Sequence, residues 1–269
     1  MPAIIRSRHN EIIKTAVRLS GSPGYRRERG LYLIEGARLC ADAAGSGVRI
    51  RALFYTERAA EKYAGYLESV KRVAGESYII GPQAEQALAQ TKSPQGIFCV
   101  CLLPDRSEQL PSLRDGGSFL ALEDLQDPSN LGTVLRTAEA LGADGVILGG
   151  NGCDPYSPKA LRASMGAVFR LPIFTAADFA EAVVKMNREG FRTVAAVPDG
   201  KAVPVTKIDW TSPCMLVVGN EGNGLSAEAR AACSERATIP MRGRAESLNA
   251  SAAAAILLWE MMRGEGGGA

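Results

Sequence analysis

Short apolar runs alternate with amphipathic stretches through the first hundred residues of the chain. The apolar runs have the length and the β-branched and aromatic content typical of strands, and the stretches between them have helical spacing. Strands are predicted at residues 32–34, 50–55, 77–80 and 96–102, with helices at 35–44 and 59–74. This order predicts a small α/β domain.

The second half of the chain repeats the alternation with longer helices. A strand at 119–125 is followed by a turn rich in helix breakers at 126–130, where Asn130 is predicted to cap the next helix and Gly132 would allow close approach to its positive end. Further strands are predicted at 145–148, 171–174, 193–197, 215–218 and 237–239, and helices at 131–141, 178–188 and 248–262. This pattern predicts a mostly parallel sheet covered by helices.

A polar segment bounded by prolines and closed by two glycines separates the two halves. Residues 104–117 have the composition of an interdomain linker. The predicted organisation is a basic helical arm at 1–25, a small domain at 26–103, the linker at 104–117 and a larger domain at 118–269.

Composition narrows the class of protein. The chain has 269 residues, of which 46% are hydrophobic and 22% charged, as in ordinary globular proteins. No apolar run reaches the roughly 20 residues of a membrane span, and the N-terminus lacks the pattern of a signal peptide. Six scattered cysteines and one histidine form no metal-binding pattern. We expect a cytoplasmic protein with no metal and no membrane association.

Positive charge is concentrated at the N-terminus. Residues 1–29 carry seven basic side chains against Glu11 and Glu28, although the whole chain has a net charge of only +2. Such a segment suits contact with a polyanion. A solvated amphipathic helix that buries Ile12, Ile13, Ala16 and Leu19 explains the same pattern. The candidate RNA contacts are Arg6, Arg8, Lys14, Arg26, Arg27 and Arg162, although Arg162 would equally suit a solvated surface or an interface.

Two loops near the C-terminus carry polar side chains beside glycines. The apolar run that begins at Leu216 breaks into three glycines around Glu221, and a second loop between residues 239 and 251 contains Ser247 and Asn249. Loops that leave adjacent parallel strands can wall a cofactor pocket, because glycine lets the backbone approach the ligand closely.

Three segments together resemble a known family. Asn130-Leu-Gly-Thr-Val-Leu-Arg136, Val218-Gly-Asn-Glu-Gly-Asn-Gly224, and Ile239-Pro-Met with Ser247-Leu-Asn-Ala-Ser251 are similar in order and spacing to the three motifs of the SpoU/TrmH RNA 2′-O-ribose methyltransferases. Residues 158–166 resemble a further family segment. Residues 33–38 resemble the start of the L30e-like substrate-binding domain that many members carry.

The resemblance implies a fold, a cofactor and a partner. It implies a SPOUT α/β domain with a deep trefoil knot, preceded by the smaller L30e-like domain at 26–103, in a homodimer that uses S-adenosylmethionine. The cofactor would lie among the knot loops, held largely by main-chain groups. Mapped onto this chain, its contacts are Gly219, Asn220, Gly224, Ile239, Met241, Leu248 and Asn249.

The catalytic residues that the resemblance implies are Asn130, Arg136, Glu221, Ser247 and Asn249. A ribose 2′-hydroxyl is a poor nucleophile and must be oriented and deprotonated as the bond forms. Arg136 matches the family's catalytic arginine, and since a guanidinium is effectively always protonated, we expect it to orient the hydroxyl or stabilise developing negative charge. Glu221 is either a proton acceptor or the group that holds Arg136 or Asn130 in place.

Two other classes of protein would each require different features of the sequence. A nucleotide-binding oxidoreductase needs a G-x-G-x-x-G turn after an early strand, and the glycines at 219, 222 and 224 have the wrong spacing and position. A noncatalytic RNA-binding protein with a vestigial cofactor pocket is a second alternative. Within the family, ribosomal RNA, and 23S RNA in particular, is favoured as substrate over transfer RNA by analogy with two-domain members.

Overall fold

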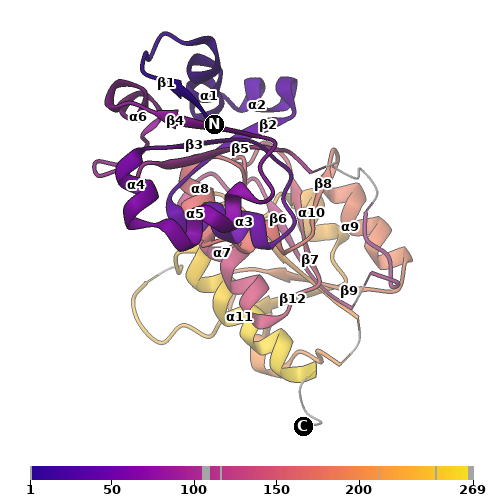
Figure 1. The fold of residues 1–269 in the computed structure, drawn as a ribbon. Coiled ribbons are helices and arrows are strands. Elements are labelled where there is room, and N and C mark those ends of the chain that lie inside the picture. The colour runs from indigo at the N-terminus through magenta and orange to yellow at the C-terminus, as the bar shows by residue number, and fades with distance from the viewer. Residues whose placement is uncertain (1, 105–109, 116, 212, 246, 266–269) are drawn as a thin grey trace. The chain divides into compact units, whose positions relative to one another are not determined.

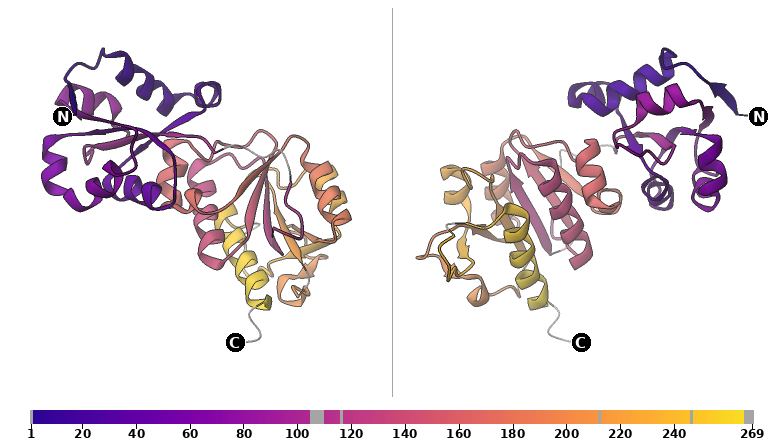
Figure 2. Two further views of the ribbon diagram at one scale, coloured as in Figure 1. Left: turned by 45° about the vertical axis from the view of Figure 1, so that its right-hand side comes forward. Right: turned by 90° about the vertical axis from the view of Figure 1, so that its left-hand side faces the viewer.

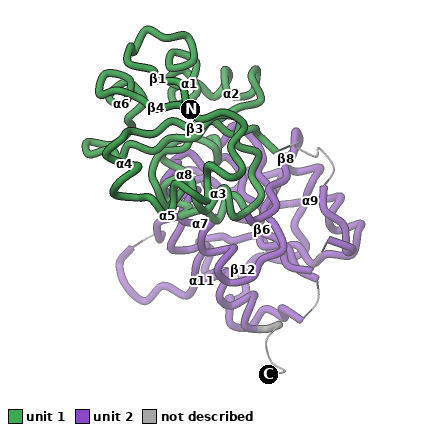
Figure 3. The backbone as a smooth tube through the Cα atoms, in the orientation of Figure 1, with its two compact units in different colours: residues 1–105, 154–169 green, residues 106–153, 170–269 purple. Residues whose placement is uncertain are grey.

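The computed structural model describes residues 2–104, 110–115, 117–211, 213–245 and 247–265. The chain forms two compact units, shown in Figure 3. Unit 1 contains residues 1–105 and 154–169, and unit 2 contains residues 106–153 and 170–269. The chain passes from unit 1 to unit 2 within the predicted linker, of which residues 105–109 and 116 lie outside the described part. The structure differs from the predicted division at 154–169, which are part of unit 1.

Unit 1 is built on a mixed five-stranded sheet in the order β1-β4-β3-β5-β2. Strand β5 runs antiparallel to both of its neighbours, whereas β4 runs parallel to β1 and β3. The strands are β1 (Ala3–Ile5), β2 (Leu31–Glu35), β3 (Ile50–Tyr55), β4 (Glu76–Ile80) and β5 (Ile97–Leu102). The last four coincide within a residue or two with the predicted strands.

Helices cover both faces of this sheet, as Figure 1 shows. On one face lie α1 (Glu11–Gly21), α2 (Pro23–Arg29) and α6 (Pro82–Leu88). On the other lie α3 (Ala37–Gly45), α4 (Glu57–Lys62) and α5 (Ala64–Lys71). The segment 154–169 adds α8 (Pro158–Ser164), which packs against β2, and the 3₁₀ turn Ala167–Phe169.

The N-terminal residues are part of unit 1 and do not form a separate arm. Strand β1 extends the sheet by pairing with β4, and α1 buries Ile13, Ala16 and Leu19 in the core. Ile12, which the helical pattern placed on the buried face, is 38% exposed because it lies beside that face. The apolar positions of α1 therefore hold it on the sheet.

Unit 2 is built on a seven-stranded sheet in the order β10-β12-β9-β11-β6-β7-β8. Every pairing in this sheet among the described residues is parallel. The strands are β6 (Ser118–Glu123), β7 (Gly145–Gly149), β8 (Ile173–Ala176), β9 (Arg192–Ala196), β10 (Val203–Pro204), β11 (Cys214–Val218) and β12 (Glu235–Thr238). The predicted covered, parallel sheet is confirmed.

Two pairs of helices cover this sheet. Helix α11 (Ala250–Glu265) packs on α7 (Pro128–Leu141) and on β11, and the two helices lie side by side in Figure 2. On the other face, α9 (Phe179–Arg188) and α10 (Ala227–Ala232) pack together over the core cluster around Phe119 and Met215. A 3₁₀ turn, Val205–Lys207, follows β10. Strands β6 and β11 lie at the centre of the sheet, so the loops that follow them begin at well-supported strands.

The start of α7 differs from the prediction. The N-cap is Asp127, whose side chain accepts a hydrogen bond from the Ser129 N–H, and Asn130 is the third residue of the helix. Proline at the first helical position explains the earlier start, because its missing N–H would be unpaired there anyway. Asn130 is thereby free to use its side chain elsewhere.

No helix among the described residues is long and apolar enough to cross a membrane. No group of three or more His, Cys, Asp or Glu side chains among them is arranged to hold a metal ion. The trefoil knot implied by the resemblance stays a prediction.

Candidate active site

The loops that follow the parallel strands of unit 2 meet at one edge of the sheet. Strands β6 and β11 are neighbours in register, so the loop after Glu123 and the loop after Val218 leave the sheet side by side. The carboxyl edge of a parallel sheet is where α/β proteins place their ligands. The three segments singled out in the sequence all reach this edge.

Glu221 fastens the loop after β11 to the start of α7. Its carboxylate accepts hydrogen bonds from the backbone N–H groups of Gln126, at 3.0 Å, and Asp127, at 3.1 Å. The Nδ2 amide of Asn130 donates to the same carboxylate at 3.1 Å. Of the two predicted roles for Glu221, the contacts match the one in which it holds Asn130.

Asn249 brings the third segment to the same point. Its Nδ2 donates to the Oδ1 of Asn130 at 3.2 Å. Its own Oδ1 accepts from the N–H and the hydroxyl of Ser251, at 2.9 and 2.6 Å, which caps the start of α11. Asn130 therefore donates to Glu221 and accepts from Asn249, and this orientation of its amide joins all three segments.

The same contacts set the ionisation of Glu221. Burial alone would raise the pKa of this carboxyl, but the hydrogen bonds from Gln126, Asn130 and Asp127 outweigh it and bring the pKa below its ordinary value. Hydrogen bonds to the charged form stabilise that form. Glu221 is thus ionised at neutral pH and is a weaker base than a free carboxylate.

Gly219 closes the loop that Glu221 anchors. A β-carbon at this position would fall well inside contact distance of the backbone of Gly224 and Leu225. The two ends of the loop are also bonded to each other, since the N–H of Asn220 donates to Gly224 O and the N–H of Gly224 donates to Asn220 O, both at 3.0 Å. The absence of a side chain at residue 219 is therefore required by the loop itself.

Two acidic residues at the end of β6, neither of them among the predicted site residues, complete the anchoring. Glu123, only 8% exposed, accepts from the N–H of Ser226 at 2.8 Å and from its hydroxyl at 2.7 Å. The backbone of Asp124 has a φ of 53°, and its carbonyl accepts from the Nδ2 of Asn220 at 2.8 Å. The feature of the sequence that could have identified them is an acidic pair at the carboxyl end of a buried parallel strand.

Arg136 lies apart from this network. It is exposed at the middle of α7 and makes no hydrogen bond or ion pair within the described part of the chain. The contacts do not support the alternative in which Glu221 holds Arg136. An exposed, permanently charged guanidinium is available to a phosphate or a developing oxyanion.

The other predicted cofactor residues present apolar and main-chain groups near the loops. Met241 and Leu248 are 40% and 36% exposed, unusual for large apolar side chains, while Ile239 is half-buried and Ser247 is exposed. Gly224 has a φ of 67° and open space where a β-carbon would stand. Exposed apolar side chains and an open glycine backbone are the kinds of group that could contact the base and the other parts of S-adenosylmethionine.

The candidate RNA contacts in unit 1 fall into two groups. Arg6, Arg8, Lys14 and Arg27 are exposed, and Lys14 forms an ion pair with Glu11 at 2.7 Å. Arg162 is half-buried, with its Nη1 enclosed and unbonded within the described residues. It lines a small hollow in unit 1 with Glu35 and Gln90.

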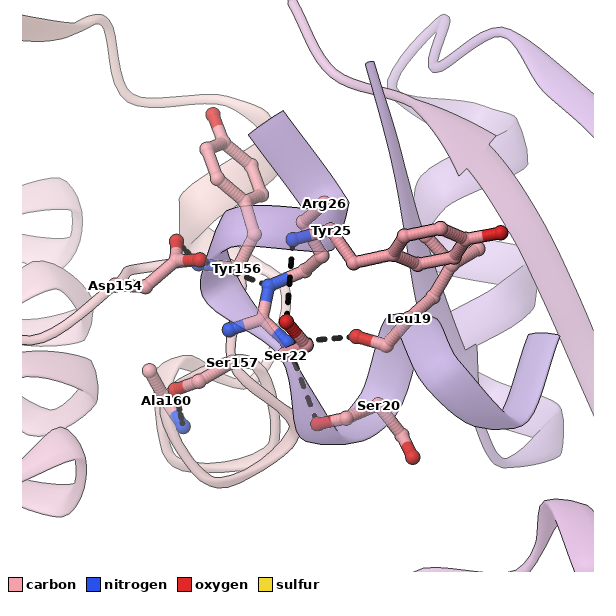
Figure 4. Close-up of polar contacts among 9 residues, drawn as sticks. All are labelled: Leu19, Ser20, Ser22, Tyr25, Arg26, Asp154, Tyr156, Ser157 and Ala160. Atoms are coloured by element: carbon pink, nitrogen blue, oxygen red, sulfur yellow. Dashed lines mark hydrogen bonds and ion pairs between the residues drawn. The ribbon is translucent and has the colours of Figure 1, made fainter. Parts of the chain in front are cut away.

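Arg26 does not fit the prediction of an RNA contact. It is 2% exposed, and its guanidinium donates to Asp154 Oδ2 at 2.8 Å and to the carbonyls of Leu19 and Ser20 at 2.6 and 3.3 Å, as Figure 4 shows. The basic run 26–29 suggested that Arg26 is exposed, because a linear sequence does not show which side of α2 faces the core. Its role in this structure is to join Asp154, at the start of the segment 154–169, to the end of α1 within unit 1.

Comparison with known families matches both units. The SpoU rRNA Methylase family matches residues 117–259, and the MRM3-like substrate binding domain matches residues 10–99. The chain belongs to the SpoU rRNA methylase family, and the predicted membership and SPOUT fold class are confirmed.

Relatives of similar length share both units. The 23S rRNA (guanosine(2553)-2′-O)-methyltransferase RlmP of Bacillus subtilis is 30% identical over 88% of this chain and 90% of its own. The AdoMet-bound rRNA methyltransferase of Sinorhizobium meliloti has a TM-score of 0.83 and 31% identity, covering 97% of both chains. The SpoU methyltransferase AviRb of Streptomyces viridochromogenes, solved with AdoMet, has a TM-score of 0.85 and 27% identity, covering 97% of this chain and 100% of its own.

Proposed function

We propose that this protein transfers a methyl group from S-adenosylmethionine to a ribose 2′-hydroxyl of 23S ribosomal RNA. The observation that carries the proposal is the junction at Asn130, where the amide donates to Glu221 at 3.1 Å and accepts from Asn249 at 3.2 Å. Three segments separated in the chain thereby form one site at the carboxyl edge of a parallel sheet. A vestigial pocket would have no need to keep this junction.

The loop residues would hold the cofactor, and Arg136 would act on the substrate. S-adenosylmethionine, when bound, supplies an electrophilic methyl group. The backbone of 219–224, with Met241 and Leu248, would bind it, while Glu221 and Asn249 keep these loops in place through Asn130. Arg136 would orient the hydroxyl or its neighbouring phosphate and stabilise the developing oxyanion. The pKa of Glu221, lowered by its hydrogen bonds against the effect of burial, favours a positioning role over proton abstraction.

Ribosomal RNA is the preferred substrate. RlmP is named for 23S rRNA and covers nearly the whole of this chain, including unit 1. Unit 1 also matches a substrate-binding domain over residues 10–99. Transfer RNA is the alternative substrate. The two proposals are distinguished by which RNA, ribosomal or transfer, gains a methyl group.

A homodimer is the proposed assembly. Helix α11 exposes Ile256 and Trp259, which are 40% and 55% exposed, one turn apart on the same side of the helix. Large apolar side chains grouped in this way are typical of an interface. We propose that this face of α11 contacts the same face of a second copy of the chain.

The decisive experiment combines cofactor binding with mapping of ribose methylation. Calorimetry should show S-adenosylmethionine binding to the purified protein and no binding of NAD. Methylation mapping of total RNA should show one 23S site that is present in cells with the gene and absent after its deletion. A folded protein that binds no S-adenosylmethionine would refute the proposed enzymatic activity. Loss of a methyl group from transfer RNA after deletion of the gene would identify transfer RNA as the substrate.

A further inference from the structure

The corner between α1 and α2 in unit 1 holds a tyrosine ring beside two arginines. The guanidinium carbon of Arg18 lies 4.0 Å from the centroid of the Tyr25 ring, and that of Arg29 lies 5.8 Å from it. Both distances fall in the range of cation–π contacts. The arginines are exposed and the tyrosine is half-buried. We refer to Arg18, Tyr25 and Arg29 as the Tyr25 cluster.

The corner that carries this cluster is firmly built. Ser22 ends α1 and caps α2, accepting a hydrogen bond from the Tyr25 N–H at 3.2 Å. Tyr25 packs against the core of unit 1, and its ring points away from the buried ion pair of Arg26 with Asp154 (Figure 4). The cluster therefore presents its charges from a fixed platform.

No ion pair among the described residues neutralises the charge of the cluster. Neither Arg18 nor Arg29 forms an ion pair within the described residues. Between residues 2 and 30, two acidic side chains are exposed, Glu11 and Glu28, and Glu11 is already paired with Lys14. Exposed basic side chains in the same stretch are Arg6, Arg8, Lys14, Arg18, Arg27 and Arg29.

We propose that the Tyr25 cluster is an RNA-binding surface that takes an unpaired stretch of the substrate RNA. The inference rests on the proposed function and assigns a specific contact to unit 1. A planar guanidinium stacks on a base with one face and donates to phosphate with its edge. Arginines already held against an aromatic ring lose less freedom when they bind than free side chains would. Single-stranded RNA offers both the bases and the phosphates.

The test measures the salt dependence of RNA binding by the full-length protein. Fluorescence anisotropy would follow a short unstructured RNA oligonucleotide, with an RNA duplex of equal length for comparison. Arg18→Gln and Arg29→Gln should each weaken binding of the unpaired RNA and reduce the slope of log K against log salt by about 0.7 to 1. Arg72→Gln, which removes an exposed arginine after α5 on the opposite face of the unit 1 sheet, should leave the slope unchanged.

Conservative variants separate the proposed surface from a purely structural contact. Tyr25→Phe should bind as the wild type does, whereas Tyr25→Leu keeps apolar packing but loses the ring and should bind like the arginine variants. Arg18→Lys should restore the slope and only part of the affinity. Unchanged slopes in Arg18→Gln and Arg29→Gln, or an equal loss in Arg72→Gln, would overturn the proposal.

Failure of this proposal is distinguishable from failure of the proposed function. Each variant would also be tested for S-adenosylmethionine binding and for methyl transfer to ribosomal RNA from cells that lack the gene. If the wild-type protein methylates this RNA and the cluster variants bind and methylate it equally well, the proposed RNA-binding surface is rejected and the proposed enzymatic function stands. Preference for the duplex would reject the unpaired stretch, and binding of acidic peptide in place of RNA would identify a protein partner instead.

Discussion

The Nδ2 of Asn249 donates a hydrogen bond to the Oδ1 of Asn130 at 3.2 Å and joins two residues that are 119 positions apart. Asn130 lies in the first turn of α7, and Asn249 immediately precedes α11. These helices pack together, and the bond between the two asparagines shows that their N-terminal ends meet. Glu221 completes the junction from the loop after β11.

Arg136→Ala should lower methyl transfer by about 100-fold or more while leaving the affinity for S-adenosylmethionine unchanged. The reason is that Arg136 is exposed and contributes no hydrogen bond within the described residues to the loops that would bind the cofactor. Single-turnover methylation and calorimetry measure the two effects. Arg188→Ala, an exposed arginine on α9, is the matched control. Lost cofactor binding with unimpaired transfer per bound cofactor would contradict the role.

Glu221→Gln should slow methyl transfer without changing the shape of the acid side of its pH–rate profile, where a carboxylate with a lowered pKa would titrate. One carboxamide oxygen cannot replace both carboxylate oxygens toward Gln126, Asp127 and Asn130, so the loop loosens. If Glu221 were the general base, the substitution would instead remove a limb of the profile.

The pKa of Glu221 also predicts an effect of acid on stability. Because the folded-state pKa lies below its ordinary value, the stabilisation is present above the unfolded pKa and disappears as the pH falls through the folded one. Thermal unfolding of the wild type should therefore lose more stability in acid than that of Glu221→Gln. Parallel pH dependences would show that the hydrogen bonds to Glu221 are weak in solution.

Gly219→Ala should disrupt the loop after β11 and reduce S-adenosylmethionine affinity at least tenfold. The added methyl group would overlap the backbone of Gly224 and Leu225, which cannot move like a flexible side chain. Gly222→Ala is the matched control, because its methyl group would meet only the Asn220 side chain at 3.4 Å. Equal affinities for the two variants, measured by calorimetry, would show that the loop adapts.

Arg26→Ala should destabilise the protein by about 3–5 kcal/mol. The substitution leaves the Asp154 carboxylate, whose side chain is 10% exposed, without its guanidinium partner. It also removes a donor from the carbonyls of Leu19 and Ser20. Urea unfolding measures the change, and Arg27→Ala, its exposed neighbour on α2, should stay within about 0.5 kcal/mol of the wild type. Similar losses in both variants would mean that Asp154 adds little.

Trp259→Glu should shift the proposed homodimer toward monomer. A charge placed at the centre of a buried apolar contact would have no partner there, and its desolvation would oppose association. Sedimentation velocity across a range of protein concentrations measures the shift. Lys185→Glu, which also introduces a carboxylate on an exposed helix face, should leave the mass unchanged. A wild type that is monomeric throughout would reject the dimer.

The sequence alone determined the elements and the family. Apolar periodicity located the main strands of both sheets, because burial imposes a local repeat that a reader of the chain can count. The segments at 130–136, 218–224 and 239–251 were recognisable because glycine and amide side chains are required there at fixed spacing. These segments then matched the SpoU rRNA Methylase family.

Only the tertiary structure decided which side chains meet. Nothing local shows that Glu221 bonds to residues more than ninety positions away, that Glu123 holds Ser226, or that Arg26 faces inward to Asp154. The partners of a side chain depend on strand order and helix packing, which bring distant segments together. For the same reason, the sequence placed residues 154–169 with the second unit, whereas buried contacts place them in the first.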